Sequence, residues 1–182
     1  DNKGEQKWNF TMASFSPRSF PTIAELLNEP GLEILISAGQ FTMGPGTSTT
    51  MYCISSRGEE LWSYFSPQPH YTNISTPVVA GIRDDSRPEV IFGITGDGGL
   101  QVLDNEGNGV WEKDIGFRFT SATVVNIDQT GPKEILIGID NSLYCFNNTG
   151  DERWHVELTE PPFATPFAKD IDGDGNVEIL IA

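Results

Sequence analysis

Residues 134–154 have the sequence EILIGIDNSLYCFNNTGDERW, which contains the main elements on which the predicted fold rests. It opens with an acidic residue and an apolar run, Glu134–Ile137, which is typical of an inner β-strand covered on both faces. The Asn and Gly residues of Asn147–Gly150 tolerate the positive φ that a tight hairpin requires. The stretch ends on the tetrad Gly150-x-x-x-Trp154. It therefore predicts short strands joined by a hairpin and followed by a bulky aromatic side chain.

The same elements recur along the whole chain. The Gly-x-x-x-Trp tetrad occurs four times and uses every tryptophan, and an acidic residue with an apolar triplet also occurs four times, at intervals of roughly 43 to 56 residues. A Thr- or Pro-containing segment precedes each acidic residue. Such a fixed order indicates a repeat architecture. The copies are Gly4/Trp8, Gly58/Trp62, Gly107/Trp111 and Gly150/Trp154 for the tetrad, and Glu33–Ile36, Glu89–Phe92, Glu134–Ile137 and Glu178–Ile181 for the acidic element.

Each unit predicts four short strands, here named A to D in chain order. In the second unit we expect them at 76–80, 89–93, 100–103 and 110–113. No segment of about twelve residues keeps a helical period without Gly or Pro, so helices are excluded. Four-stranded units of about 45 residues predict an all-β fold, a β-propeller of four-stranded antiparallel blades. We expect each tryptophan to fill the space between adjacent blades.

The predicted units divide one β-propeller domain into about four blades. They are about 9–62, 63–111, 112–154, and 155–182 together with 1–8, so one blade is split between the termini. Two alternatives follow: an N-terminal strand partly closes a four-blade ring, or the chain is a segment of a longer propeller. An unpaired strand is an exposed edge, which favours the segment.

Composition restricts the partners. Lys and Arg number 11 against 26 Asp and Glu, which gives the 182-residue chain a net charge of −15. Such a polyanion is repelled by nucleic acid and by anionic membrane surfaces, and no apolar run approaches the roughly 20 residues of a membrane span. We therefore expect no nucleic-acid partner and no membrane insertion. The acidity suits cation binding and an extracellular location.

Two cysteines make no disulfide framework, and we expect Cys53 and Cys145 to be buried.

The A–B loop of the last unit is the strongest candidate site. Residues 170–178 (DIDGDGNVE) place carboxylates at positions 1, 3, 5 and 9, and the two glycines permit the tight curl that brings them together. Hard oxygen donors in this number suit Ca²⁺ better than Mg²⁺, and the absence of His and Cys disfavours zinc. The alternative is a turn of solvated acids, which mutual repulsion opposes. The predicted ligands are Asp170, Asp172, Asp174, Asn176 through its carbonyl, and Glu178.

The other A–B loops are degenerate copies of this one. The third keeps oxygen-bearing residues at the four positions with less charge, which predicts a possible weaker metal site at Asn126, Asp128, Thr130 and Glu134. Arg83 and Leu27 stand at the third position of the second and first loops, where we expect no metal.

At these residues the chain resembles known families. The Asp-x-Asp-Gly-Asp-Gly-x-x-Glu-Ile-Leu stretch at 170–180 resembles the FG-GAP (VCBS) repeat of integrin α-subunit propellers and of many secreted bacterial and archaeal proteins. Residues 143–150, leading into Trp154, resemble the PQQ-like repeat of periplasmic propellers. The resemblance implies a calcium-bearing propeller used for binding on or outside the cell surface. By position it assigns the calcium-ligand role to Asp170, Asp172, Asp174, Asn176 and Glu178; the PQQ likeness implies no cofactor pocket.

The D–A connections are expected on the face opposite the cation loop. They carry aromatic residues beside arginine, a combination that suits sugar or peptide recognition. The alternative is that these aromatic side chains pack beneath the loops. The candidate ligand face comprises Arg18, Phe20, His70, Tyr71, Phe117, Arg118 and Phe119.

Catalytic motifs are scarce. There is no Gly-x-Ser-x-Gly, no phosphate-binding Gly loop and no convincing partner for either histidine, so we expect no catalytic residues here. The leading hypothesis is a calcium-stabilised propeller that binds a protein or glycan in adhesion, in an extracellular, cell-surface or periplasmic location. The remaining blades of a longer chain, or another copy, are further expected partners. The alternatives are the propeller part of a secreted polysaccharide lyase or PQQ-type dehydrogenase with catalytic residues elsewhere, and a purely structural scaffold.

Overall fold

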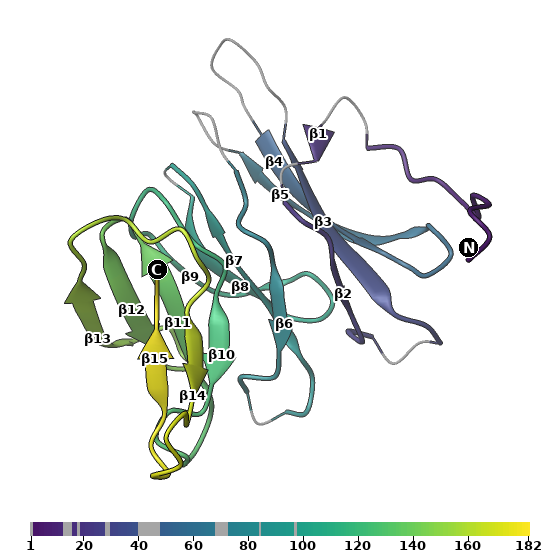
Figure 1. Cartoon of the computed structure of the whole chain (residues 1–182). Coiled ribbons are helices and arrows are strands. Elements are labelled where there is room, and N and C mark those ends of the chain that lie inside the picture. Colours follow the sequence, from purple (N-terminus) through teal and green to yellow (C-terminus); the bar gives the residue numbers. More distant parts are fainter. Residues whose placement is uncertain are drawn as a thin grey trace.

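The computed structural model describes residues 2–12, 16–17, 19–27, 30–39, 48–67, 73–83, 85–96 and 98–182. All regular secondary structure in these ranges is β-strand, and no helix able to cross a membrane occurs among them. The strands form successive antiparallel sheets, which Figure 1 shows as blades that follow one another from the N-terminal to the C-terminal part of the chain.

Three of the sheets contain all four strands of a blade. Blade 1 consists of β2 (Thr22–Ala24), β3 (Glu33–Gly39), β4 (Ser48–Ile54) and β5 (Glu60–Pro67), and the short β1 (Ser16–Pro17) also pairs with β3. Blade 2 consists of β6 (Val78–Ala80), β7 (Glu89–Ile94), β8 (Gly99–Leu103) and β9 (Gly109–Lys113). Blade 3 consists of β10 (Thr123–Val125), β11 (Glu134–Ile139), β12 (Ser142–Phe146) and β13 (Glu152–Glu157). Blade 4 contains β14 (Phe167–Lys169) and β15 (Glu178–Leu180).

This arrangement confirms the predicted fold class, an all-β propeller built from four-stranded antiparallel blades. Each blade is a meander in which sequential strands pair, so A, B, C and D lie in order across the sheet. The four strands expected in the second unit are confirmed to within two residues at each end. The periodic turn residues sufficed for this because hairpin connections leave little freedom in register.

The B strands of blades 2 and 3 are buried along their whole length, as their continuous apolar runs predicted, whereas Leu180 on β15 is half-exposed. In β7, Val90, Phe92 and Ile94 contribute to a core shared with blade 1, whereas Ile91 between them contributes to a core shared with blade 3. Successive side chains of a strand point to opposite faces, so one strand serves both cores. The hydrophobic core of this protein therefore lies between blades.

A tryptophan contact joins blade 1 to blade 2 and blade 2 to blade 3, and it confirms the predicted wedge. The ring of Trp62, on the D strand of blade 1, lies over Gly107 in the C–D turn of blade 2, and its indole N–H donates to the Asn105 carbonyl at 3.0 Å. Gly107 has a φ of +85°, and a Cβ there would lie 2.8 Å from the indole ring. The same contact joins Trp8 to the Gly58 turn and Trp111 to the Gly150 turn, each with an indole N–H bond of 3.0 Å.

Candidate functional site

The four A–B loops share a hydrogen bond that fixes their shape. The glutamate that begins each B strand accepts the backbone N–H of the residue seven positions earlier, at 2.7 to 2.9 Å. Glu134 and Glu178 were predicted only as metal ligands, although the recurrence of this glutamate in all four units, including the two without a metal motif, pointed to a structural role. The pairs are Glu33 with Leu26, Glu89 with Ile82, Glu134 with Ile127, and Glu178 with Ile171.

In blades 2 and 3 an arginine supplies positive charge to this glutamate. Arg83 Nε lies 2.7 Å from Glu89 Oε1, and its Nη2 lies 3.2 Å from Asp85. The Glu89 side chain is fully buried, and a buried carboxylate is costly without a partner. The hydrogen bond to Glu89, reinforced by both carboxylates, raises the pKa of Arg83 above its ordinary value. The guanidinium therefore acts as the cation of the blade 2 loop.

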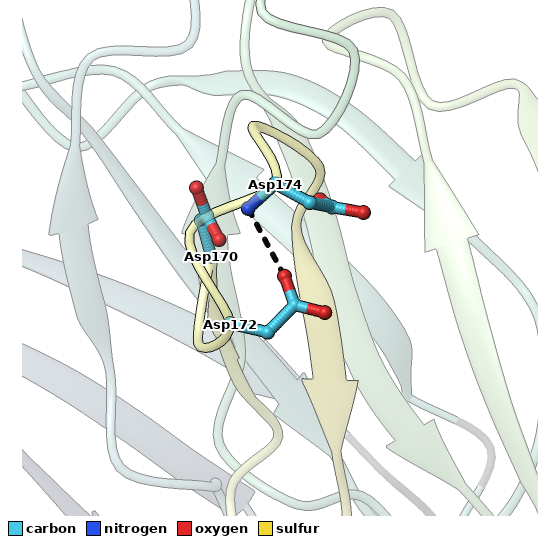
Figure 2. A group of neighbouring side chains, drawn as sticks. All are labelled: Asp170, Asp172 and Asp174. Atoms are coloured by element: carbon cyan, nitrogen blue, oxygen red, sulfur yellow. Dashed lines mark hydrogen bonds between the residues drawn. The ribbon is translucent and has the colours of Figure 1, made fainter.

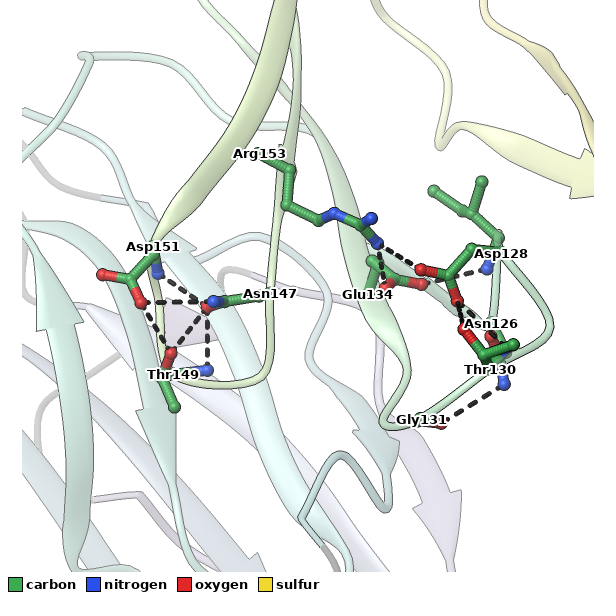
Figure 3. A network of polar contacts seen from close by, with 10 residues as sticks. Asn126, Asp128, Thr130, Gly131, Glu134, Asn147, Thr149, Asp151 and Arg153 are labelled. Atoms are coloured by element: carbon green, nitrogen blue, oxygen red, sulfur yellow. Dashed lines mark hydrogen bonds and ion pairs between the residues drawn. The ribbon is translucent and has the colours of Figure 1, made fainter.

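The blade 3 loop receives its arginine from another strand. Arg153, on β13, pairs through Nη1 with Glu134 and with Asp128 Oδ2, the latter at 3.1 Å (Figure 3). The hydrogen bond to Asp128 is the main reason that the pKa of Arg153 is raised. The pKa of Asp128 is lowered, chiefly by the N–H of Thr130 and further by Arg153. Beside them Asn126 Oδ1 is buried and has no hydrogen-bond partner among the described residues. Two of the four predicted residues, Asp128 and Glu134, thus contact a guanidinium, while Thr130 donates to Asp128 and the Asn126 amide donates to the Gly131 carbonyl.

The blade 4 loop gathers aspartates where blade 2 has an arginine. Asp172 occupies the loop position of Arg83. Asp170, Asp172 and Asp174 each offer a carboxylate oxygen within 4.8 Å of the others (Figure 2). Backbone N–H groups hold these side chains: Gly173 and Gly175 donate to the two oxygens of Asp170, and Asp174 donates to Asp172. The structure therefore brings three of the five predicted ligands together.

Asn176 and Glu178 have other contacts in this loop. The Asn176 N–H donates to Asp174 Oδ1 at 2.7 Å, and this bond is the main reason that the pKa of Asp174 is lowered. Glu178 Oε2 accepts the N–H of Ile171. The three clustered aspartates fit a hard divalent cation, because they offer oxygen donors only and their loop contains no His or Cys.

The predicted ligand face lies partly within the described residues. Arg18, His70 and Tyr71 fall outside them. Phe20 and Phe119 line a cavity of about 590 Å³ where the D–A connections meet the A strands, here named the axial mouth. Phe117 and Arg118 lie on the connection that ends at Phe119, and their N–H groups donate to the carboxylate of Asp140.

Hydroxyl groups in the axial mouth were missed by the sequence analysis. Ser19, Ser75 and Thr120 each accept a B-strand N–H from the residue 18 positions later, at 3.0 to 3.1 Å. Phe163, from the fourth D–A connection, also lines the mouth and is 89% exposed. The sequence pattern that could have revealed them is a Ser or Thr that stands 18 positions before a B-strand residue in three of the units. The mouth is thus assembled from equivalent positions of all four blades.

Comparison with known proteins supports the fold alone. No protein-family model and no curated protein matches the chain. A protein of unknown function from Bacteroides caccae is similar in structure, with 17% identity and a TM-score of 0.50 over 87% of this chain and 52% of that protein. The V. cholerae biofilm matrix protein Bap1 has 16% identity and a TM-score of 0.41 over 81% of this chain and 30% of Bap1. BBS1N, solved in complex with ARL6DN, has 12% identity and a TM-score of 0.42 over 95% of this chain and 76% of BBS1N.

The lengths of these structures differ from that of the chain. This chain spans about half of the Bacteroides caccae protein and less than a third of Bap1.

Proposed function

We propose that this chain is part of a calcium-stabilised β-propeller that binds a protein or glycan in adhesion, in an extracellular, cell-surface or periplasmic location. One observation carries the calcium part: three carboxylates converge within 4.8 Å in the blade 4 loop, at the place where the blade 2 loop holds a guanidinium. The resemblance of residues 170–180 to FG-GAP (VCBS) repeats supports the same proposal. We also propose that the hairpin of residues 143–150 and the tryptophan that follows it, Trp154, form a PQQ-like repeat.

The cation would be held by Asp170, Asp172 and Asp174, with Asn176 and Glu178 completing the set. Its role would be to hold the A–B loop against the repulsion of its own carboxylates, as Arg83 does in blade 2. The loop lies at the end of the blade opposite the axial mouth. Calcium would therefore stabilise the scaffold without touching the ligand.

In blade 3 we propose that Arg153 replaces the cation. Its guanidinium already contacts Asp128 and Glu134, the charged members of the predicted weaker site. A divalent ion would have to displace it. We therefore expect one high-affinity calcium site in this chain, in blade 4.

Thermal unfolding with and without calcium tests the proposal. Because calcium would bind the folded chain only, Tm should rise by several degrees when excess Ca²⁺ replaces EGTA. Asp172→Ala should abolish this difference. Asp85→Ala, which removes an acidic residue from the equivalent loop of blade 2, is the matched control and should keep it. An equal Tm in Ca²⁺ and EGTA for the wild type would overturn the calcium assignment.

The tryptophan contacts between blades also support the proposal that further blades, or another copy of the chain, pack against this one. Gly4 has a positive φ similar to that of the three glycines covered by a tryptophan, yet no atom of the described residues lies within 4 Å of its Cβ position. Trp154 packs on the apolar side chains between blades 3 and 4. We propose that further blades, or another copy of the chain, supply a tryptophan to the Gly4 turn and a glycine turn to Trp154.

A further inference from the structure

The axial mouth is built by the blades in a repeated way. The residues just before β2, β6, β10 and β14 line it, so each blade contributes the same segment. Backbone hydrogen bonds hold these segments in place: Ser75 N–H donates to the Gly93 carbonyl and Thr120 N–H to that of Gly138, both in B strands, and Phe163 N–H donates to the Ala182 carbonyl just beyond β15, at 2.9 to 3.0 Å. The mouth is therefore positioned by the blade backbones themselves.

Two phenylalanines at this mouth are exposed to an unusual degree. Phe20 is 81% exposed and Phe163 is 89% exposed, whereas Phe92 and Phe146 in the interblade cores are fully buried. Large aromatic side chains that gather at a concave site are typical anchors of protein recognition. Phe119, half-buried between them in the sequence, lines the same cavity. The mouth thus offers aromatic surface that a ligand would cover.

The polar groups of the mouth restrict the chemistry of that ligand. Among the described residues that line it, none is charged and none carries a carboxamide. Ser19, Ser75 and Thr120 already accept backbone N–H groups. A glycan brings many hydroxyl donors that need strong acceptors, and the mouth offers few. A peptide brings one N–H and one C=O per residue beside an apolar side chain, which suits this lining.

An adjoining cavity extends the site. It has a volume of about 200 Å³ and shares Phe119, Thr120 and Phe163 with the mouth. Arg118 and Asp140 line its other side, and the Asp140 carboxylate is already occupied by the N–H groups of Phe117 and Arg118. Two adjoining cavities with shared walls fit an extended segment better than a compact small molecule. The net charge of −15 opposes an acidic segment.

We propose that the axial mouth binds an uncharged peptide segment of a partner protein, with an aromatic or branched apolar side chain inserted among Phe20, Phe119 and Phe163. This deepens the proposed binding function and rests on it. The backbone of the segment would continue into the adjoining cavity past Phe163. The calcium loop takes no part in the contact.

Titration by NMR with three probes tests the proposal. The probes are the neutral tripeptide amides Ac-Gly-Phe-Gly-NH₂ and Ac-Gly-Ala-Gly-NH₂ and the neutral disaccharide cellobiose, added to the calcium-saturated chain. The Phe peptide should give saturable shifts at the mouth, and the Ala peptide and cellobiose should bind at least about tenfold more weakly. Phe163→Ala should weaken the Phe peptide by a similar factor. Phe65→Ala, an equally large change at an exposed phenylalanine on β5, should leave it unchanged.

The outcomes separate the two proposals. Absence of saturable binding by the Phe peptide, or equal binding by Phe163→Ala, overturns the peptide site. Stronger binding of cellobiose that is lost in Phe163→Ala also overturns it, yet leaves the proposed binding function as glycan recognition. Loss of the calcium response with unchanged peptide binding overturns the calcium part alone.

Discussion

Replacing Gly107 by alanine tests the tryptophan contact that joins neighbouring blades. Gly107 has a φ of +85°, and a Cβ there would lie 2.8 Å from the Trp62 ring. Carbon atoms attract best at about 3.5–4.0 Å, so the indole would have to retreat by roughly 0.7 Å. Its N–H bond to Asn105 and its packing in the core between blades 1 and 2 oppose that movement.

The expected cost has two parts. An L-residue in the left-handed region costs about 1–2 kcal/mol, and overpacking a fitted contact adds about 1–3 kcal/mol. Gly107→Ala should therefore lower the free energy of unfolding by about 2–5 kcal/mol. Gly131→Ala is the matched control, because Gly131 has a φ of +73° but, in the part of the chain that the structure describes, nothing within 4 Å of its Cβ position. It should cost only the first part, about 1–2 kcal/mol.

Urea unfolding followed by far-UV circular dichroism, in saturating Ca²⁺, measures both variants. The midpoints should separate while the slope m stays constant. In a Trp62→Leu background the excess cost of Gly107→Ala over Gly131→Ala should largely disappear, because the clashing ring is gone. If the two alanine variants differ by less than about 0.5 kcal/mol in the wild-type background, the contact does not hold the blades as argued.

Three further predictions concern charge and thiol chemistry. Arg153→Leu should destabilise the calcium-free chain, because the buried carboxylate of Glu134 loses its positively charged partner. Calorimetric titration of this variant should then find two Ca²⁺ ions per chain, and an unchanged count of one would contradict the proposal that arginine replaces the cation in blade 3. Partial burial would raise the pKa of Asp104, but hydrogen bonds from Asn108 and Glu106 outweigh it and hold the pKa below 3.8. Because the pKa of Asp104 is lower in the folded chain than in the unfolded chain, this stabilisation is present above pH 3.8 and is lost as the pH falls through the folded pKa. Asp104→Asn should therefore lose less stability on acidification than the wild type. An equal dependence of the free energy of unfolding on pH in the two proteins would refute this. Burial, with a smaller effect of Glu33, raises the pKa of the Cys53 thiol to about 12, so a thiol reagent at neutral pH should label Cys53 only after urea is added; rapid labelling of the folded chain would disagree.

The strand pattern was predictable because the blade is a local structure. Sequential strands pair through short hairpins, so the order of apolar runs and turn residues fixes the meander. The wedge role of Trp62 was also predictable, since a tryptophan at the same place in each unit has one natural position, between blades. The convergence of Asp170, Asp172 and Asp174 followed from two glycines that allow a tight curl.

The roles that depend on distant residues were not predictable. Arg153 reaches Asp128 from β13, across the width of the blade, and the loop sequence of residues 126–134 does not indicate that an arginine side chain pairs with it. The axial mouth combines Phe20, Phe119 and Phe163, and the first and last of these lie more than a hundred residues apart in the sequence. The first contact depends on how the strands of blade 3 pair, and the second depends on how neighbouring blades pack together.

The repeating blade, the interblade tryptophans and the acidic loop of residues 170–178 could be read from the chain alone, because each rests on a local contact or on the period that relates the units. The pairing of Arg153 with the carboxylates of the blade 3 loop, and the aromatic side chains that share one cavity, are visible only in the folded protein. Charge compensation and concave surface arise where separate strands are brought together, and spacing along the sequence does not encode that proximity.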